Sequence, residues 1–389
     1  MNTTLSPTSD RVKLALSGAL ALACFMGFGR FSFTPILPGM MADLHLSASQ
    51  AGSIAAANFT GYLAGALLAS GRWAAGRERQ VVIAALLATA VLLAAMGAVS
   101  SLPAFLVIRF LAGLASAFGL VFTSSIVLSA AGNDTAVQAG HFGGVGIGIS
   151  LSALVSFIAV TLSGGVDVPW RVEWLIGGAI VLLAGFGVIG LLPRLKPAEG
   201  GPVAEPPLVW SAPMILITLS YLLFGFGYVV AATFLVVMAR TSASGPLVEF
   251  LCWLITGVAA MGSLLAWRPA LRRFGPETTY RISLSVEALG SAAMVLLPAL
   301  VAPLIGGLLF GATFVVVTAY ALTIGRLLSP KSPRRVIGIM TAGFGIGQIA
   351  GPVVAGYIVD HTGSYVAASL LAAAMLALGA AIAPSGGKD

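Results

Sequence analysis

Apolar stretches long enough to cross a membrane recur along the whole of this sequence, separated by short polar breaks. A helix needs about 20 mainly apolar residues to span the hydrocarbon core of a bilayer. By that measure the sequence predicts twelve spans, at 13–38, 49–70, 80–100, 103–130, 138–163, 171–192, 211–238, 246–267, 279–298, 302–328, 335–359 and 363–383. Because helices satisfy their own backbone polar groups in lipid, we expect an all-α membrane protein.

Composition excludes a soluble globular domain. Charged residues make up 8% of the chain and hydrophobic residues 58%, whereas soluble domains carry about 25% charged residues. The net charge of +7 does not indicate a nucleic-acid partner, because the basic residues are scattered at the ends of the predicted spans. We therefore expect the lipid bilayer as a partner and no nucleic acid.

The placement of Lys and Arg predicts the orientation. With the N-terminus in the cytoplasm and alternating spans, 16 of the 20 basic residues fall on the cytoplasmic side, as the positive-inside rule requires. Only Arg171 and Arg240 fall near the outer side. We expect a multi-pass protein of the inner (plasma) membrane with both termini cytoplasmic. The first span is too long for a cleaved signal peptide, so we expect it to remain as an anchor.

Glycine motifs recur at about half the length of the chain. Gly-Phe-Gly occurs at 27–29 and 225–227, a Gly-x-Gly-Ile-Gly run occurs at 144–148 and 343–347, and single glycines occur at 113 and 311. The offsets are 225 − 27 = 198, 343 − 144 = 199 and 311 − 113 = 198. Six spans separate the copies, so both halves point the same way across the membrane.

A proline-rich break from Pro193 to Pro207 falls between the two halves. Such a segment is typical of a linker. We expect an N-terminal six-helix bundle at 1–195, a cytoplasmic linker at 196–209 and a C-terminal six-helix bundle at 210–389.

These motifs resemble the major facilitator superfamily over essentially the whole chain. Residues 109–113 (RFLAG) are similar to its Arg-x-x-x-Gly motif, and residues 71–79 (GRWAAGRER) resemble its basic loop without the usual aspartate. More narrowly, residues 27–38 (GFGRFSFTPILP) and 345–352 (GIGQIAGP) resemble the YbfB/YjiJ branch. The resemblance implies two bundles that rock around a central site near the midplane.

Two arginines, Arg30 and Arg109, lie within predicted spans. A charge at that depth costs at least about 2.5 kcal/mol, so it normally faces protein or water. No acidic residue of the first half lies deep enough to pair with them. Arginine can hold a carboxylate with two parallel hydrogen bonds, which favours contact with an anionic substrate. A coupling or gating role remains open, as does a structural one, in which the side chain caps carbonyls, reaches the interface or pairs with Glu249.

Glu287 is the only carboxylate deep in a span. A buried carboxylate can carry a proton or hydrogen-bond a neighbouring helix. Weaker candidates for ligand contact lie in the helices that line the cavity of the resembled family: Asn58, Tyr62, Tyr221, Tyr228, Tyr320 and Gln348. Amides and phenols can orient a ligand or bridge two helices.

Motifs for other chemistries are absent from the sequence. It contains no phosphate-binding Gly-x-x-x-x-Gly-Lys run, no metal-ligand spacing and no Gly-x-Ser-x-Gly turn. We therefore expect neither an enzyme nor an ATP-driven pump, and no cofactor or metal. The sequence predicts a monomeric secondary transporter for a small organic solute, with an anion favoured and protons as the coupling ion. An efflux pump of the same fold and a non-transporting membrane sensor remain as alternatives.

Overall fold

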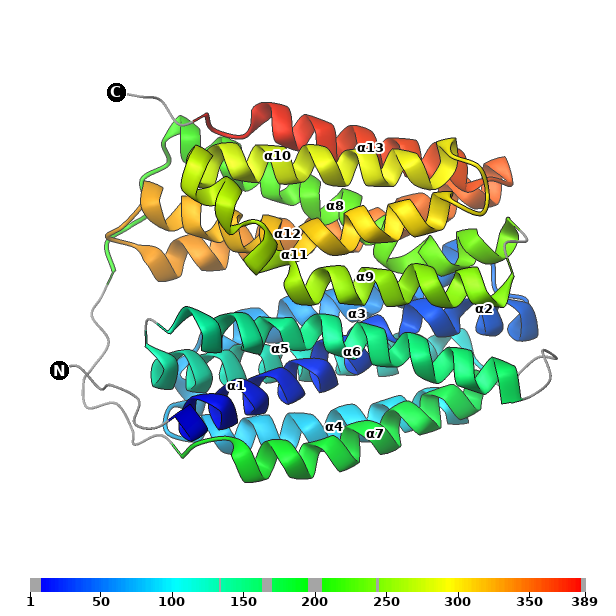
Figure 1. Ribbon diagram of the computed structural model, residues 1–389, viewed down its shortest axis with the longest axis horizontal. Coiled ribbons are helices and arrows are strands. Elements are labelled where there is room, and N and C mark those ends of the chain that lie inside the picture. The colour runs from blue at the N-terminus through cyan, green and yellow to red at the C-terminus, as the bar shows by residue number, and fades with distance from the viewer. Residues whose placement is uncertain (1–7, 133, 163–169, 195–204, 243–244, 386–389) are drawn as a thin grey trace.

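The computed structural model describes residues 8–132, 134–162, 170–194, 205–242 and 245–385, and its regular elements there are all helices (Figure 1). In chain order these are α1 (Thr8–Leu22), η1 (Ala23–Phe31), α2 (Phe33–Leu44), α3 (Ala48–Ala69), η2 (Arg72–Ala74), α4 (Glu78–Ala98), α5 (Leu102–Ala131), α6 (Thr135–Leu162), α7 (Trp170–Leu191), α8 (Ala212–Thr241), α9 (Pro246–Ala266), α10 (Arg268–Leu296), α11 (Ala302–Leu328), α12 (Pro333–Thr362) and α13 (Tyr365–Ile382). The expected all-α fold is confirmed.

The helices match the predicted spans closely. The first span is longer than the predicted 13–38, because α1, η1 and α2 follow one another from residue 8 to residue 44. Within the described residues, eleven helical stretches are long and apolar enough to cross a membrane. The predicted ninth span falls in α10, which is less apolar because several charged residues lie in its first half. Gly275, with φ 74°, interrupts α10 before the segment that corresponds to this span.

The helices form two groups (Figure 1). Helices α1 to α7 lie together in the lower part of the view, and α8 to α13 lie together above them. These groups are called the first and second halves below. Residues 195–204 of the predicted linker lie outside the described part of the chain.

The glycine repeat corresponds to a repeated packing contact. A Cβ atom on Gly113 would lie 1.9 Å from the carbonyl oxygen of Asn58, and one on Gly311 would lie 2.2 Å from that of Thr256. The two contact partners are themselves 256 − 58 = 198 residues apart. Each glycine therefore allows the same close approach of two helices, once in each half.

The two ends of the molecule differ in how the halves meet. The terminal end is defined here as the end where α1 begins and α13 finishes, and the far end is the opposite one (Figure 1). At the far end the carboxylate of Asp360, from α12, accepts hydrogen bonds from Ser47 Oγ (2.8 Å) and from the N–H groups of Ala48 (2.9 Å) and Ser49 (3.0 Å) at the start of α3. Thr34 also donates to the carbonyl of Ala232 across the halves. These hydrogen bonds join the two halves at and near the far end.

Candidate functional site

A cavity of about 540 Å³ lies between the two halves. Its lining runs from Arg30, in the middle of the first span, to the exposed Arg326 near the terminal end. Side chains from η1, α3, α5 and α6 of the first half face side chains from α8 to α12 of the second. A mostly apolar space with a few polar groups between two helix bundles is the usual form of a small-molecule site.

Arg30 is the charged group at the inner end of this cavity. Its side chain is 4% exposed, and its Nη2 atom donates a hydrogen bond to the Tyr228 hydroxyl at 3.1 Å. Its guanidinium carbon lies 4.3 Å from the centre of the Tyr62 ring and 4.7 Å from that of Phe59. The Nε atom of Arg30 has no hydrogen-bond partner among the described residues. The cation is thus held by aromatic rings and a neutral hydroxyl, and its buried Nε–H is unused.

Tyr228 connects this arginine to the second half. Its hydroxyl also accepts a hydrogen bond from the Gln348 amide. Its ring stacks on Phe224, with ring centres 4.9 Å apart, and on Phe344, with ring centres 5.6 Å apart. The predicted residues Arg30, Tyr62 and Tyr228 line the cavity together, and Gln348 lies directly behind Tyr228.

Arg109 lies outside the cavity lining, although it is beside Arg30. Its side chain is 2% exposed and donates from Nη1 to the carbonyl of Gly29 at 3.2 Å and from Nη2 to that of Arg30 at 3.1 Å. The π-helical segment η1 ends at Phe31, and Pro35 in the following turn has no N–H to donate. In this structure Arg109 caps two backbone carbonyls, which is one of the structural alternatives that the sequence leaves open.

The remaining predicted residues lie outside the lining of this cavity. The Asn58 side chain donates to the Arg109 carbonyl at 3.0 Å. Tyr221 and Tyr320 are buried outside the cavity lining. Glu249 accepts two hydrogen bonds from Arg240, at 2.7 and 3.0 Å, so the alternative in which it pairs with Arg30 or Arg109 does not occur here.

Glu287 is buried within the second half. Its side chain is 1% exposed, and neither carboxylate oxygen has a hydrogen-bond partner in the described part of the chain. Thr313 of α11 lies close to it, but the Thr313 hydroxyl donates to the carbonyl of Leu309 at 2.7 Å. An ionised carboxylate without partners is strongly disfavoured in such a site, so the geometry suits a protonated side chain.

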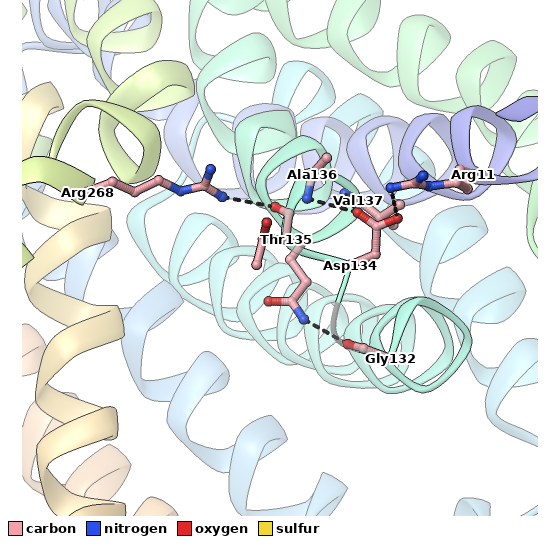
Figure 2. Close-up of polar contacts among 8 residues, drawn as sticks. Arg11, Gly132, Asp134, Thr135, Ala136, Val137 and Arg268 are labelled. Atoms are coloured by element: carbon pink, nitrogen blue, oxygen red, sulfur yellow. Dashed lines mark hydrogen bonds and ion pairs between the residues drawn. The ribbon is translucent and has the colours of Figure 1, made fainter. Parts of the chain in front are cut away.

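Two arginines line the mouth of the cavity, although the sequence indicates for them only a place on the cytoplasmic side of the membrane. These are Arg268 and Arg326. Figure 2 shows Arg268 reaching from α10 to the start of α6, where it donates to the carbonyl of Thr135 at 3.4 Å. In the same view Arg11 pairs with Asp134, just before α6. No sequence signal marked Arg268 and Arg326 as cavity residues, because they share the pattern of all basic residues at span ends.

Four phenylalanines of the cavity wall were also missed: Phe31, Phe142, Phe314 and Phe344. One signal was available, since Phe344 lies inside the repeated glycine run at 343–347. Among the residues that the structure describes, no group of three His, Cys, Asp or Glu side chains could hold a metal ion.

A family model described as "Uncharacterised MFS-type transporter YbfB" matches residues 22–384. The chain belongs to this family of major facilitator transporters. Its fold and family are those of transporters and not of enzymes. The resemblance noted in the sequence motifs is thereby confirmed.

Other known proteins are similar to this transporter. A probable high-affinity nitrate transporter 2.4 from Oryza sativa subsp. japonica is 31% identical over 186 residues. That alignment covers 46% of this chain and 38% of the relative, so the chain spans less than half of the length of the curated relative that it matches.

Two crystal structures of the nucleoside transporter NupG have the same fold. One, of a point mutant, has a TM-score of 0.75 at 16% identity, covering 95% of this chain and 98% of that one. The second structure has a TM-score of 0.69 at 16% identity, covering 96% and 98%. At this identity the likeness concerns the fold alone.

Proposed function

We propose that this transporter moves a small organic anion through the cavity between its halves, with Arg30 as the group that binds the anion. The observation that carries the proposal is the environment of Arg30. It is a buried cation that lines the cavity, it has an unused donor, and among the described residues no acidic side chain lines that cavity. A ligand carboxylate would supply the missing negative charge through charge-assisted hydrogen bonds.

The arrangement of the two ends supports alternating access. The halves are joined at the far end by Asp360 and Thr34, while the cavity extends toward the terminal end. Rocking of the halves would break the far-end contacts and close the cavity mouth. The distribution of Lys and Arg supports a cytoplasmic terminal end, and in an inner membrane the structure would then be the inward-facing state of a monomeric carrier.

We propose protons as the coupling ion and Glu287 as their binding group. Its buried, unpartnered carboxylate supports this role. The equivalent position in the first half is Thr89, since 287 − 89 = 198, so the shared fold does not itself require a carboxylate there. Glu287→Gln should leave anion binding intact and abolish proton movement. Retention of proton movement would assign the coupling to another group.

The relatives are named for substrates that differ in charge. The rice relative is named as a nitrate transporter, and nitrate is an anion. NupG is named as a nucleoside transporter, and nucleosides are uncharged ring compounds. Arg30, a buried cation, supports the anionic substrate for this chain.

A flux assay tests the proposal. Purified transporter would be placed in liposomes that contain a pH-sensitive dye, and organic anions would be added one at a time under an imposed pH gradient. We expect at least one anion to change the internal pH, with no response from Arg30→Gln liposomes. Arg272→Gln is the matched control, because it removes the same charge at an exposed position outside the cavity lining. An equal response from the Arg30→Gln protein would refute the role of Arg30.

The same liposomes separate uptake, efflux and sensing. An anion that leaves the lumen against its gradient when protons enter indicates efflux. Binding in detergent with no flux in either direction would favour the alternative of a non-transporting sensor.

A further inference from the structure

We propose that the substrate is an aromatic monocarboxylate: a molecule with one carboxylate and a flat ring system. This inference rests on the proposed function and names the class of anion that the same cavity takes. Two independent properties of the cavity carry it, namely its charge and its wall.

The charge favours a single carboxylate. Arg30 is the one ionisable cation at the inner end of the described cavity lining, and the other two cations, Arg268 and Arg326, lie at the mouth. A monoanion bound at Arg30 pairs with the one inner guanidinium that faces the cavity, because Arg109 beside it lies outside the lining and donates to two backbone carbonyls. The second charge of a dianion would lie in the mostly apolar cavity without a partner, which is costly.

The hydrogen bonds of Arg30 leave room for a carboxylate. The present partner of Nη2 is a neutral phenol, Tyr228, and Nε has no partner among the described residues. A buried donor without an acceptor is destabilising, so a ligand that satisfies it gains affinity. A carboxylate that takes the place of the Tyr228 hydroxyl would offer two acceptors to one guanidinium edge, and it would form the stronger, charge-assisted type of bond.

The aromatic wall of the cavity favours a ligand with a flat ring system. Six aromatic side chains line the cavity: Phe31, Tyr62, Phe142, Tyr228, Phe314 and Phe344. The rings of Tyr228, Phe314 and Phe344 are nearly parallel, with interplanar angles of 6° between Tyr228 and Phe314 and 11° between Tyr228 and Phe344. A flat ligand can continue such a stack, and each aromatic pair adds a favourable contribution beyond the burial of area.

The size of the cavity excludes nitrate as a well-fitting ligand. A volume of about 540 Å³ lies in the range of sites for drug-sized organic molecules, roughly 300–1,000 Å³. A nitrate ion at Arg30 would leave the aromatic wall uncovered. A nucleoside would cover the wall and leave Arg30 without a counter-charge.

A binding panel tests the class. The affinity of the detergent-purified transporter would be measured by calorimetry for 1-naphthoate, phenylacetate, cyclohexanecarboxylate, 1-naphthamide, phthalate, uridine and nitrate. We expect 1-naphthoate to bind most tightly. The neutral amide should be weaker by about tenfold or more, because it loses a charge-assisted hydrogen bond. Cyclohexanecarboxylate should be weaker than phenylacetate by about threefold or more, because it loses the aromatic contacts.

Substitutions test which cavity residues produce these binding preferences. Arg30→Gln should abolish the preference for 1-naphthoate over 1-naphthamide. Arg272→Gln, at an exposed position outside the cavity lining, should change it by less than about threefold at physiological salt, where exposed charges are screened. Phe344→Leu should reduce the preference for phenylacetate over cyclohexanecarboxylate. Should Arg30→Gln fail to fold, the wild-type panel still decides the class by itself.

The outcomes separate this inference from the proposed function. Tightest binding of uridine, nitrate or an aliphatic acid would overturn the aromatic monocarboxylate, and anion flux in the liposome assay would still uphold the carrier. Failure of every anion both to bind and to move would overturn both.

Discussion

Arg30 donates a hydrogen bond to Tyr228, and the two residues occupy equivalent positions of the internal repeat. Each follows a Gly-Phe-Gly motif, and 228 − 30 = 198. Thr34 and Ala232 are also in contact, and 232 − 34 = 198. Contacts between equivalent residues lie on the axis that relates the halves. The repeat therefore places an arginine and its hydroxyl partner at the centre of the molecule, where both halves can act on one ligand.

Tyr228→Phe tests this relationship while keeping the aromatic ring. The change removes the acceptor of both Arg30 and Gln348, so the ligand-free protein should lose about 1–3 kcal/mol of stability. It also frees Arg30 for an anion. We expect a lower melting temperature without ligand and a larger stabilisation by 1-naphthoate than in the wild type. Phe224→Leu, which alters the same stack without a hydrogen bond, is the control. A smaller stabilisation by 1-naphthoate would mean that the hydroxyl binds the substrate itself.

Arg109→Gln tests whether Arg109 has a structural role and no role in ligand binding. The change leaves the carbonyls of Gly29 and Arg30 without their donors, which should lower the free energy of unfolding by about 2 kcal/mol or more. Arg109→Lys should not restore it fully, because an ammonium lacks the planar fork that reaches both carbonyls. The measurement is thermal unfolding in detergent.

Anion binding by the folded fraction of Arg109→Gln provides the second readout. We expect its preference for 1-naphthoate over 1-naphthamide to remain, whereas Arg30→Gln should lose that preference. Loss of the preference in both variants would place Arg109 in the binding site.

The spans and their repeat could be predicted because they depend on local sequence. Apolar length determines a membrane span, and Gly113 and Gly311 recur because two backbones touch there. The different surroundings of Arg30 and Arg109 could not be predicted. Both are buried arginines. The packing of η1 against α5 directs Arg109 to the backbone carbonyls and Arg30 to the cavity. The role of Phe344 likewise depends on which face of α12 meets Tyr228.

The link between Arg11 and Asp134 predicts a local pH dependence (Figure 2). Desolvation alone raises the pKa of Asp134, but hydrogen bonds from the N–H groups of Val137 and Ala136 and the nearby Arg11 outweigh it and lower the pKa below its usual value. Because the pKa of Asp134 is lower in the folded state, the ionised carboxylate stabilises the fold at pH values above its unfolded-state pKa of about 3.9. That contribution is lost as the pH falls through the lower, folded-state pKa.

Hydrogen exchange in the first turn of α6 measures this effect. After correction for intrinsic rates, wild-type protection of Ala136 and Val137 should decrease as the pH falls below about 4. Protection in Asp134→Asn should be independent of pH over the same range. Parallel pH profiles in the two proteins would rule out Asp134 as the titrating group.

Asp360 should hold the two halves together at the far end. Its carboxylate joins α12 of the second half to the N-terminus of α3 in the first half through three hydrogen bonds. A carboxylate at a helix N-terminus gains both hydrogen bonds and a favourable interaction with the helix dipole. Asp360→Asn removes the charge and one accepting oxygen, so the far end should open more often.

Cysteine accessibility measures that opening. Ala48 of α3 is 4% exposed and lies against Gly356 of α12 in the other half. Ala48→Cys, with Cys24 and Cys252 replaced by Ala, would be labelled with a membrane-impermeant maleimide. We expect Asp360→Asn to raise the labelling rate about fivefold to tenfold, the shift given by about 1–1.4 kcal/mol. Asp43→Asn is the matched control, because Asp43 accepts its hydrogen bond from Trp170 within the first half, at 2.8 Å. An equal increase in both variants would mean that lost charge, and not the link between the halves, opens the far end.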